Sequence, residues 1–176
     1  MSNCIYIATS LDGFIARKDG SIDWLTEIPN PDNSDFGFGD FIKNIDAIVM
    51  GKNTFETILS FTEWLYPKKV FVLSSTLKSI PDNVSDKAEL INGKPDYVVD
   101  LLHSRNYTNL YIDGGKTIQT FLEQDLIDEM IITKIPILLG DGIPLFGKMD
   151  TDKRFIHTKT EILAGSLVKS YYKRDR

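Results

Sequence analysis

Four short segments of the chain combine glycine or hydroxyl residues with the end of an apolar run. They are residues 9–13 (TSLDG), 50–54 (MGKNT), 73–76 (LSST) and 113–117 (DGGKT). Glycine lets a ligand approach the backbone closely, and the first N–H groups of a helix bind phosphate oxygens. Lys52 adds a positive charge, and Thr54 and Thr117 add hydroxyl donors. Each segment alone is also typical of a simple turn, but the ordered set favours a nucleotide phosphate site.

The hydrophobic pattern predicts alternating strands and helices over most of the chain. Apolar runs favour strands, and helical spacing favours helices in between. Such alternation indicates an α/β fold with a mostly parallel central sheet and helices on both faces. The last three runs follow one another without a helix, which predicts a C-terminal antiparallel hairpin turning at residues 164–166. The predicted strands are 3–9, 47–50, 70–73, 89–91, 110–112, 130–134, 158–163 and 167–172, and the predicted helices are 35–44, 53–60, 97–104 and 117–123.

This arrangement places the four segments at one edge of the sheet. In sheets of this kind, ligands bind beyond the carboxyl ends of the strands. Residues 10–33 form a long loop after the first strand, with turn signals at Asp12-Gly13 and Asp19-Gly20. A loop of this length in a compact domain is usually functional or mobile. We therefore expect it to border the ligand site.

Composition narrows the class of protein. The chain has 176 residues, which is typical of one domain, and its net charge of −5 disfavours a nucleic-acid-binding protein. Cys4 is the single cysteine, and His103 and His157 lie in no motif, so no disulfide or metal site is predicted. The apolar runs are too short to span a membrane, and the first residues lack the basic and apolar regions of a signal peptide. We therefore expect a cytoplasmic location.

The motifs, in order and spacing, resemble the dihydrofolate-reductase-like superfamily. The last motif and residues 10–13 are similar, more narrowly, to the reductase domain of the bifunctional riboflavin-biosynthesis deaminase-reductase and its stand-alone bacterial relatives. The resemblance runs from Ile5 to about Tyr172 and implies one domain of this fold over residues 1–176. The segments that carry it are YIATSLDGFIARKDGSIDWL (6–25), IVMGKNTFETI (48–58), VFVLSST (70–76), LYIDGGKTIQTFL (110–122) and IPILLGDGIPLFG (135–147).

The resemblance implies an NADPH-dependent oxidoreductase. Its acceptor would be a small heterocycle of pyrimidine type, as in the reduction of 5-amino-6-(5-phosphoribosylamino)uracil in riboflavin biosynthesis. Lys52 together with Ser74 suits a 2′-phosphate, which favours NADPH over NADH. The implied cofactor residues are Ala8, Ile15 and Ala16 near the nicotinamide, Gly51, Lys52, Asn53 and Thr54 at the pyrophosphate and adenosine, Leu73, Ser74 and Ser75 beside the adenine ribose, and Ile112, Gly114, Gly115, Lys116, Thr117 and Ile118 at the second phosphate junction. The resemblance also implies a cis peptide bond between Gly114 and Gly115, and a homodimer.

Two carboxylates are the candidate catalytic residues. By resemblance, a carboxylate at the start of the first helix orients the substrate, and Asp35 occupies that spacing, with Asp40 as its rival. Asp35 within Asn-Ser-Asp is equally typical of a helix N-cap. Asp113 occupies the place of the acidic residue that contacts the pyrimidine in the riboflavin reductases. A turn aspartate at the end of a strand is the alternative for Asp113.

The sequence departs from both branches of the superfamily. Where dihydrofolate reductases carry an arginine for the glutamate tail of the substrate, this chain has Pro67-Lys68-Lys69, and lysine is a poor replacement for a bidentate fork. The Pro-Thr-Leu of the riboflavin enzyme is Lys116-Thr117-Ile118 here. Three alternatives stay open: reduction of a pterin, a non-catalytic NADP-binding module, and a plain α/β domain in which the glycines only form turns.

Overall fold

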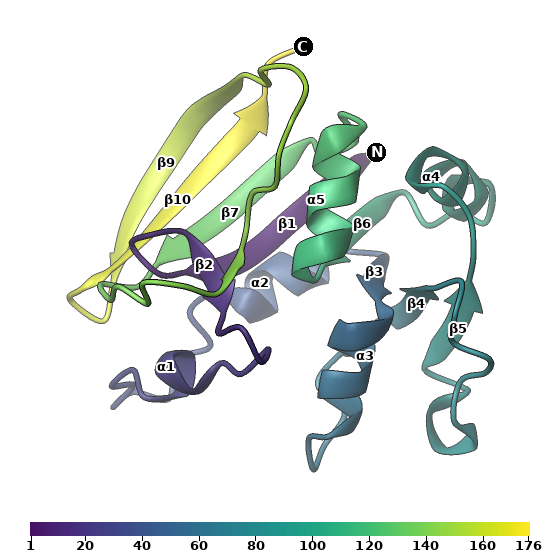
Figure 1. Ribbon diagram of the computed structural model, residues 1–176, viewed down its shortest axis with the longest axis horizontal. Helices are drawn as coiled ribbons and strands as arrows, with labels where there is room; N and C mark the ends of the chain where they lie inside the picture. Colours follow the sequence, from purple (N-terminus) through teal and green to yellow (C-terminus); the bar gives the residue numbers. More distant parts are fainter.

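The computed structural model describes all of residues 1–176 (Figure 1). Strands and helices alternate from the third strand to the seventh, and strands alone close the chain. None of the helices is both long and apolar enough to cross a membrane. The elements are β1 (Ser2–Thr9), β2 (Phe14–Ala16), α1 (Asp23–Thr26), α2 (Phe38–Lys43), β3 (Ala47–Gly51), α3 (Lys52–Leu59), β4 (Lys69–Leu73), the 3-10 helix η1 (Asp82–Val84), β5 (Ala88–Ile91), α4 (Pro95–Ser104), β6 (Asn109–Asp113), α5 (Gly115–Glu123), β7 (Glu129–Lys134), β8 (Ile143–Pro144), β9 (Phe155–Leu163) and β10 (Leu167–Arg174).

Eight strands form one mostly parallel sheet in the order β5-β4-β3-β6-β1-β7-β10-β9. The strands from β5 to β7 pair in parallel, β10 pairs antiparallel with β7, and β9 pairs antiparallel with β10. The predicted α/β class and the C-terminal antiparallel hairpin are therefore confirmed. The hairpin turns at Ala164 and Gly165, which both have positive φ.

The order of the strands reverses between β3 and β6, which are direct neighbours. From β3 the chain crosses through α3 to β4 on one side, and from β6 it crosses through α5 to β7 on the other side. Because such crossovers are right-handed, opposite directions place the two helices on opposite faces of the sheet. Figure 1 shows α3 and α5 running away from each other from the ends of these strands. A crevice at such a reversal is the usual ligand site of a parallel sheet.

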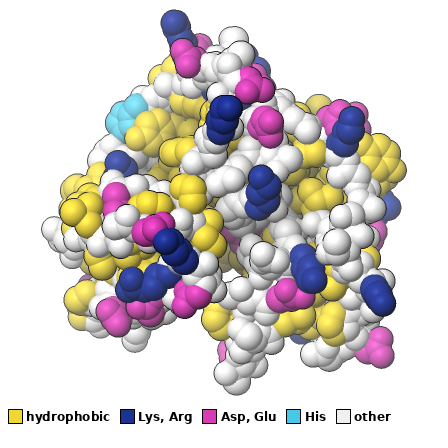
Figure 2. All heavy atoms as spheres, viewed as in Figure 1, with side chains coloured by type: hydrophobic (Ala, Val, Ile, Leu, Met, Phe, Trp, Pro, Cys, Tyr) yellow, Lys and Arg dark blue, Asp and Glu magenta, His cyan; other side chains and the backbone are white.

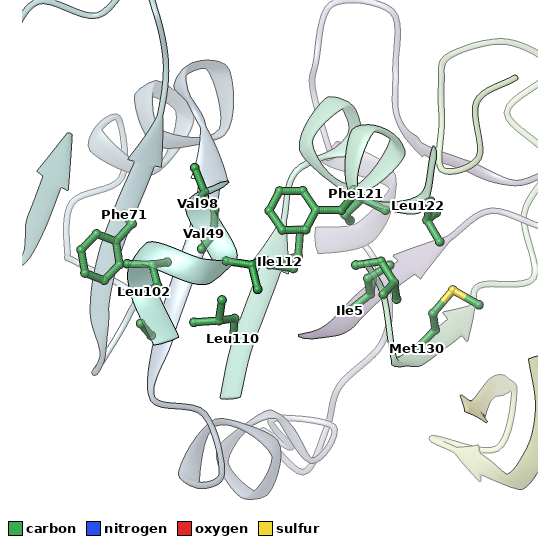
Figure 3. Packing of buried hydrophobic residues seen from close by; sticks show 14 of the residues in the cluster. Ile5, Val49, Phe71, Val98, Leu102, Leu110, Ile112, Phe121, Leu122 and Met130 are labelled. Atoms are coloured by element: carbon green, nitrogen blue, oxygen red, sulfur yellow. The ribbon is translucent and has the colours of Figure 1, made fainter. Parts of the chain in front are cut away.

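A hydrophobic layer covers each face of the sheet. On one face α4 and α5 pack on the strands, and Figure 3 shows this cluster running from Phe71 through Ile112 to Met130. On the other face Phe55 of α3 and Ile42 of α2 pack on β3 and β4. The two layers fix the positions at which α3 and α5 begin, and so they fix the edges of the crevice.

The loop predicted at residues 10–33 contains two short elements. Strand β2 pairs antiparallel with β8, and Trp24 of α1 is buried against Ile135 and Leu167. The Asp12 carboxylate accepts hydrogen bonds from the backbone N–H groups of Leu139 and Gly140 at 3.2 and 2.8 Å. The loop is therefore attached to the segment before β8 and follows a defined path along the edge of the sheet.

Two details differ from the sequence predictions. The helix predicted at residues 35–44 begins only at Phe38, because Gly37 has φ +86° and ends the preceding turn. All peptide bonds are trans, so the prediction of a cis bond between Gly114 and Gly115 was wrong. The unusual backbone conformation at this junction is instead the positive φ of Gly114, +87°.

Candidate active site

A cavity of about 890 Å³ occupies the crevice between β3 and β6. It extends from the first turn of α4 to the loop that carries α1, and more than half of its lining residues are hydrophobic. The predicted glycine junctions at residues 50–54 and 113–117 and both predicted carboxylates reach this one space, whereas residues 9–13 do not line it. The predicted site residues that line it are Ala8, Ile15, Ala16, Asp35, Gly51, Lys52, Asn53, Thr54, Leu73, Asp113, Gly114, Gly115, Lys116 and Thr117.

Four predicted cofactor residues do not line the cavity. The side chains of Ile112 and Ile118 are fully buried in the hydrophobic cluster around α5. Ser74 and Ser75 follow β4, where the Ser74 hydroxyl accepts the backbone N–H groups of Thr76 and Leu77 at 3.1 and 3.0 Å. A sequence motif marks a whole segment, whereas some side chains of a strand or helix face the core rather than the cavity.

The helices α3 and α5 begin against each other. A methyl group added to Gly51 would lie 2.9 Å from the Thr117 hydroxyl oxygen, and one added to Gly114 would overlap the Thr54 hydroxyl. Neither helix has a side-chain cap at its N-terminus. The first N–H groups of a helix lack intrahelical acceptors and carry partial positive charge. Two uncapped helix starts therefore face the cavity side by side, which suits a bound phosphate group.

Lys52 and Lys116 are the basic residues that line the cavity, and both belong to these helix starts. The Lys52 ammonium lies 3.6 Å from the Glu56 carboxylate one turn later, and its side chain stays partly exposed. A pair at this distance on a surface helix is weak and leaves the lysine available to a stronger anion.

Asp113 ends β6 at the floor of the cavity. One carboxylate oxygen accepts the Tyr66 hydroxyl at 2.6 Å, and the other accepts the backbone N–H of Gly114 at 2.8 Å. Burial raises the pKa of Asp113, although these two hydrogen bonds oppose the shift. Burial also raises the pKa of Tyr66, so its hydroxyl stays protonated and donates to Asp113. The floor of the cavity thus holds a carboxyl group that exchanges its proton closer to neutral pH than an ordinary aspartate.

Asp35 lines the opposite wall but is used differently. Its two carboxylate oxygens accept the backbone N–H groups of Gly37 and Gly39, both at 2.8 Å, at the start of α2. These bonds lower the pKa of the exposed Asp35. Asp40 does not line the cavity, and its carboxylate pairs with Lys43 at 2.8 Å. Of the two rivals, Asp35 therefore reaches the cavity. It is not the N-cap of α2, which is Gly37, but its carboxylate holds two N–H groups at the entry to this helix.

Comparison with known proteins places this geometry in a family. The family model described as the RibD C-terminal domain matches residues 4–168. The chain belongs to the RibD C-terminal domain family.

Solved structures agree with this membership. This RibD C-terminal domain protein is 48% identical to a Shewanella sp. PV-4 protein whose name refers to riboflavin biosynthesis, with a TM-score of 0.97 and complete coverage of both chains. A Thermotoga maritima deaminase and 5-amino-6-(5-phosphoribosylamino)uracil reductase has a TM-score of 0.75 at 16% identity, over 99% of this chain and 56% of that one. The dihydrofolate reductase of Enterococcus faecalis, solved with NADP(H), has a TM-score of 0.65 at 16% identity, over 99% and 97% of the two chains. At 16% identity, the Thermotoga and Enterococcus structures show that this chain shares their fold.

Aromatic side chains at the floor were not among the predicted site residues. Tyr6 of β1, Phe38 of α2 and Tyr66 line the cavity and contact one another, with ring centroids 5.6 Å apart for Tyr6 and Phe38 and 6.4 Å apart for Phe38 and Tyr66. The one sequence feature that could have indicated Tyr6 is its place next to Ile5 in β1, because neighbouring side chains of a strand point to opposite faces of the sheet. The two tryptophans do not line the cavity: Trp24 packs in the core and Trp64 lines a separate hollow.

Proposed function

We propose that this protein is an NADPH-dependent reductase that transfers a hydride to a small heterocycle of pyrimidine type. The observation that carries the proposal is the pair of uncapped helix starts at Gly51 and Gly114, which share one cavity with the partly buried Asp113. The RibD C-terminal domain family and the uracil reductase named for the Thermotoga neighbour support this reaction type. The NADP(H) in the Enterococcus neighbour supports the cofactor.

The residues of the cavity fit such a cofactor. Helix starts with free N–H groups suit the pyrophosphate. Because Gly114 has no side chain, its backbone can lie close to Thr54 and to a bound ligand. Lys52 supplies the positive charge expected beside a 2′-phosphate. Ala8 and Ile15 are small or apolar residues suited to the nicotinamide ring, and Leu73 lies at the adenosine side. When bound, NADPH supplies the hydride.

The protein's own contribution to the chemistry lies at the cavity floor. Reduction adds a hydride to a carbon atom and a proton to a nitrogen or oxygen atom of the acceptor. Asp113 is placed to hold an N–H or O–H group of the acceptor and to exchange this proton, because burial raises the pKa of its carboxyl group. Tyr66 fixes the orientation of the carboxyl through its hydrogen bond. The hydrophobic lining excludes water from the reacting atoms.

Reduction of a pterin is the second candidate. The aromatic floor and a carboxylate would suit a pterin ring, and the fold is that of the dihydrofolate reductases. Lys68 and Lys69, however, line a separate hollow rather than this cavity, so neither reaches an acceptor bound there. This arrangement favours an acceptor without the glutamate tail of folate.

Cofactor titration tests the proposal. The purified protein is titrated with NADPH and with NADH, and nicotinamide and protein fluorescence are followed. We expect saturable binding with a preference for NADPH, followed by oxidation when a pyrimidine acceptor is added. Binding of neither cofactor would refute the reductase and the NADP-binding module together. Tight binding without oxidation by any pyrimidine or pterin acceptor would favour the non-catalytic module.

We also propose, from the family resemblance, that the protein forms a homodimer without nucleic-acid or membrane partners and acts in the cytoplasm. Figure 2 shows acidic and basic side chains intermixed with hydrophobic ones on the face viewed in Figure 1, without a broad surface of one charge. Light scattering after size-exclusion chromatography measures the mass in solution. A monomer at all concentrations would contradict the dimer.

A further inference from the structure

We propose that Lys169 is a positioning residue for the reaction, which holds the cavity wall formed by Asp35, Phe36 and Phe38 in the shape that binds the acceptor. The inference rests on the proposed reductase function and adds to it a residue that lies outside the cavity. It follows from the contacts of one buried ammonium group with the turn that leads into α2.

Lys169 lies in β10, beside the cavity rather than in it. Figure 1 shows β10, β7 and β1 next to one another in the sheet. Lys169 pairs with Thr133 of β7, and Thr133 pairs with Ala8 of β1. Residues directly opposite each other on neighbouring strands point to the same face of the sheet. Because Ala8 and Thr133 line the cavity, the Lys169 side chain starts from the same row of the sheet as two residues of the cavity.

The Lys169 ammonium is buried against a turn of the chain. The residue is only 3% exposed, and its ammonium donates to the Phe36 carbonyl at 2.9 Å and to the Tyr6 hydroxyl at 3.1 Å. The Tyr6 hydroxyl donates to the same carbonyl at 2.8 Å. A methyl group added to Gly37 would lie 2.9 Å from the ammonium nitrogen, so the backbone of the turn packs directly on it. Two donors, one of them charged, therefore hold a single carbonyl group.

The backbone of this turn is strained. Phe36 has φ +54° and Gly37 has φ +86°. The left-handed conformation is ordinary for glycine but uncommon for a bulky residue such as phenylalanine, and it persists only where the surroundings fix it. Asp35, Phe36 and Phe38 all line the cavity. A strong bond to the Phe36 carbonyl therefore fixes the course of this wall.

The wall adjoins the carboxyl group that is proposed to serve the acceptor. The rings of Tyr6 and Phe38 contact each other, and Phe38 also contacts Tyr66. The Tyr66 hydroxyl in turn donates to Asp113 at 2.6 Å. A shift of the turn would therefore move rings that are in contact with the partner of Asp113, where the acceptor is proposed to bind.

The fold does not require the charge of Lys169. Its ammonium belongs to none of the ion pairs of the structure, and it lies 4.8 and 5.4 Å from the ring centroids of Tyr6 and Tyr171. Burial lowers the pKa of Lys169, although the nearby Glu161 carboxylate opposes the shift. Without the ammonium, the Phe36 carbonyl would still accept the Tyr6 hydroxyl. Because a buried charge without an ionic partner costs stability, its presence points to a role in the site.

Lys169→Met tests the inference, because methionine keeps an unbranched apolar side chain but removes the charge and the donors. The full-length protein is assayed with NADPH and 5-amino-6-(5-phosphoribosylamino)uracil, the acceptor in the name of the Thermotoga neighbour. We expect KM for this acceptor, and its calorimetric dissociation constant for the NADP+-saturated protein, to rise by about tenfold, because a bond from a charged donor is lost. The dissociation constant for NADPH should stay within about twofold. Unchanged values for the acceptor, or no binding of it to the wild type, would overturn the inference.

Thermal unfolding separates positioning from a purely structural role. Lys169→Met removes a buried charge and leaves the Phe36 carbonyl with one donor, so its unfolding temperature should stay within about 2 °C of the wild type or rise. Lys169→Arg keeps a charged donor and should restore KM to within about threefold of the wild-type value. A large loss of stability with an unchanged KM would show that Lys169 serves the fold alone. Equal KM values for the two variants would overturn the role of the charged donor.

Lys159→Met is the matched control. The Lys159 ammonium lies 5.3 Å from the centroid of the same Tyr171 ring and 2.9 Å from the Glu161 carboxylate, but its side chain is 58% exposed and no hydrogen bond joins it to Phe36. This variant should leave KM for the acceptor within about twofold, since exposed charges contribute little. A rise equal to that of Lys169→Met would show that positive charge near the Tyr171 ring, rather than the bond to Phe36, sets KM, and would overturn the inference.

Hydrogen exchange gives a readout that does not depend on turnover. The Gly37 and Gly39 N–H groups donate to the Asp35 carboxylate, both at 2.8 Å. Lys169→Met should speed the exchange of these two groups by about tenfold and leave exchange in β3 and β6 unchanged, because the turn opens more readily while the core does not. Equal exchange in the variant and the wild type would overturn the inference. Failure of the proposed function is distinguishable, because it appears as binding of the acceptor to the wild type without oxidation of NADPH.

Discussion

The two ends of the cavity are built from different chemical groups. At the proposed cofactor end, the backbone N–H groups of the first turns of α3 and α5, which follow Gly51 and Gly114, face the cavity. At the proposed acceptor end, the groups that line the cavity are side chains, chiefly Asp113, Tyr66 and Phe38. Backbone groups are fixed by the fold and serve any phosphate, whereas side chains can change without altering the fold. Under the proposed function, the first end would serve as the cofactor site and the second end would determine the acceptor.

The largest effect is expected from Asp113→Asn, which changes the acceptor end alone. The amide keeps the shape but cannot exchange a proton near neutral pH, so kcat for acceptor reduction should fall by about a hundredfold. The dissociation constant for NADPH, measured by fluorescence, should stay within about twofold, because the amide oxygen of the variant can still accept the Gly114 N–H that Asp113 holds at 2.8 Å. In the wild-type protein, a rate that needs protonated Asp113 falls as the pH rises through its raised pKa. This limb of the pH profile should be absent from the variant.

Tyr66→Phe sharpens the same test. It removes the hydroxyl that donates to Asp113 at 2.6 Å but retains the carboxyl. We expect a smaller loss of kcat, of about tenfold, and a further rise in the pKa seen in the pH profile, because a bond that stabilises the carboxylate is gone. If either variant weakened NADPH binding as much as it slowed reduction, the division of the cavity into two ends would be wrong.

Gly114→Ala should break the cofactor end. The residue has φ +87°, and an added methyl group would overlap the Thr54 hydroxyl. The backbone would have to move away from α3, and a non-glycine residue in this region costs about 1–3 kcal/mol. We expect the affinity for NADPH to fall by about fiftyfold, as measured by fluorescence titration, together with a lower temperature of unfolding.

Gly165→Ala is the matched control for this change. Gly165 also has positive φ, +72°, but an added methyl group meets nothing within 4 Å. It should lower the unfolding temperature through backbone strain and leave NADPH binding unchanged. Equal losses of NADPH affinity in the two variants would show that general strain, rather than the contact between α3 and α5, controls the cofactor end.

Lys52→Ala should produce a smaller and more selective effect. Removing the ammonium is expected to weaken NADPH binding by about tenfold and NADH binding by less than about twofold, because only NADPH carries the 2′-phosphate. Both constants are measured by nicotinamide fluorescence. Lys78→Ala is the control, since Lys78 is exposed and does not line the cavity. Equal losses of affinity for both cofactors would refute the proposal that Lys52 binds the 2′-phosphate.

The same division explains what the sequence could predict. Gly51 and Gly114 follow short apolar strands, so local patterns located the two helix starts that line the cavity, and alternation of strands and helices predicted the parallel sheet. Tyr66 escaped prediction because it meets Asp113 across 47 residues of sequence, through a loop whose path no local pattern specifies. Ile112 and Ile118 were overpredicted, because a motif identifies a segment without showing which of its side chains enter the core.

The smallest effect is expected from Asp35→Ala, which tests whether this carboxylate serves the fold or the acceptor. Two backbone donors hold the pKa of Asp35 below its usual value. The ionised carboxylate therefore stabilises the fold at pH values above the ordinary aspartate pKa of about 3.9, and this stabilisation disappears as the pH falls through the lower pKa of the folded state. We expect the variant to unfold about 2 to 4 °C below the wild type at pH 7, with the difference shrinking below pH 4 in thermal denaturation followed by circular dichroism.

Asp40→Ala separates capping from a general loss of negative charge. Asp40 lies on α2, which Asp35 precedes, and pairs with Lys43, but its carboxylate holds no backbone N–H group in the way that Asp35 does. Its removal should change the unfolding temperature by less than about 1 °C, since exposed pairs contribute little. A pH-independent loss of stability would show that Asp35 only fills space at the wall.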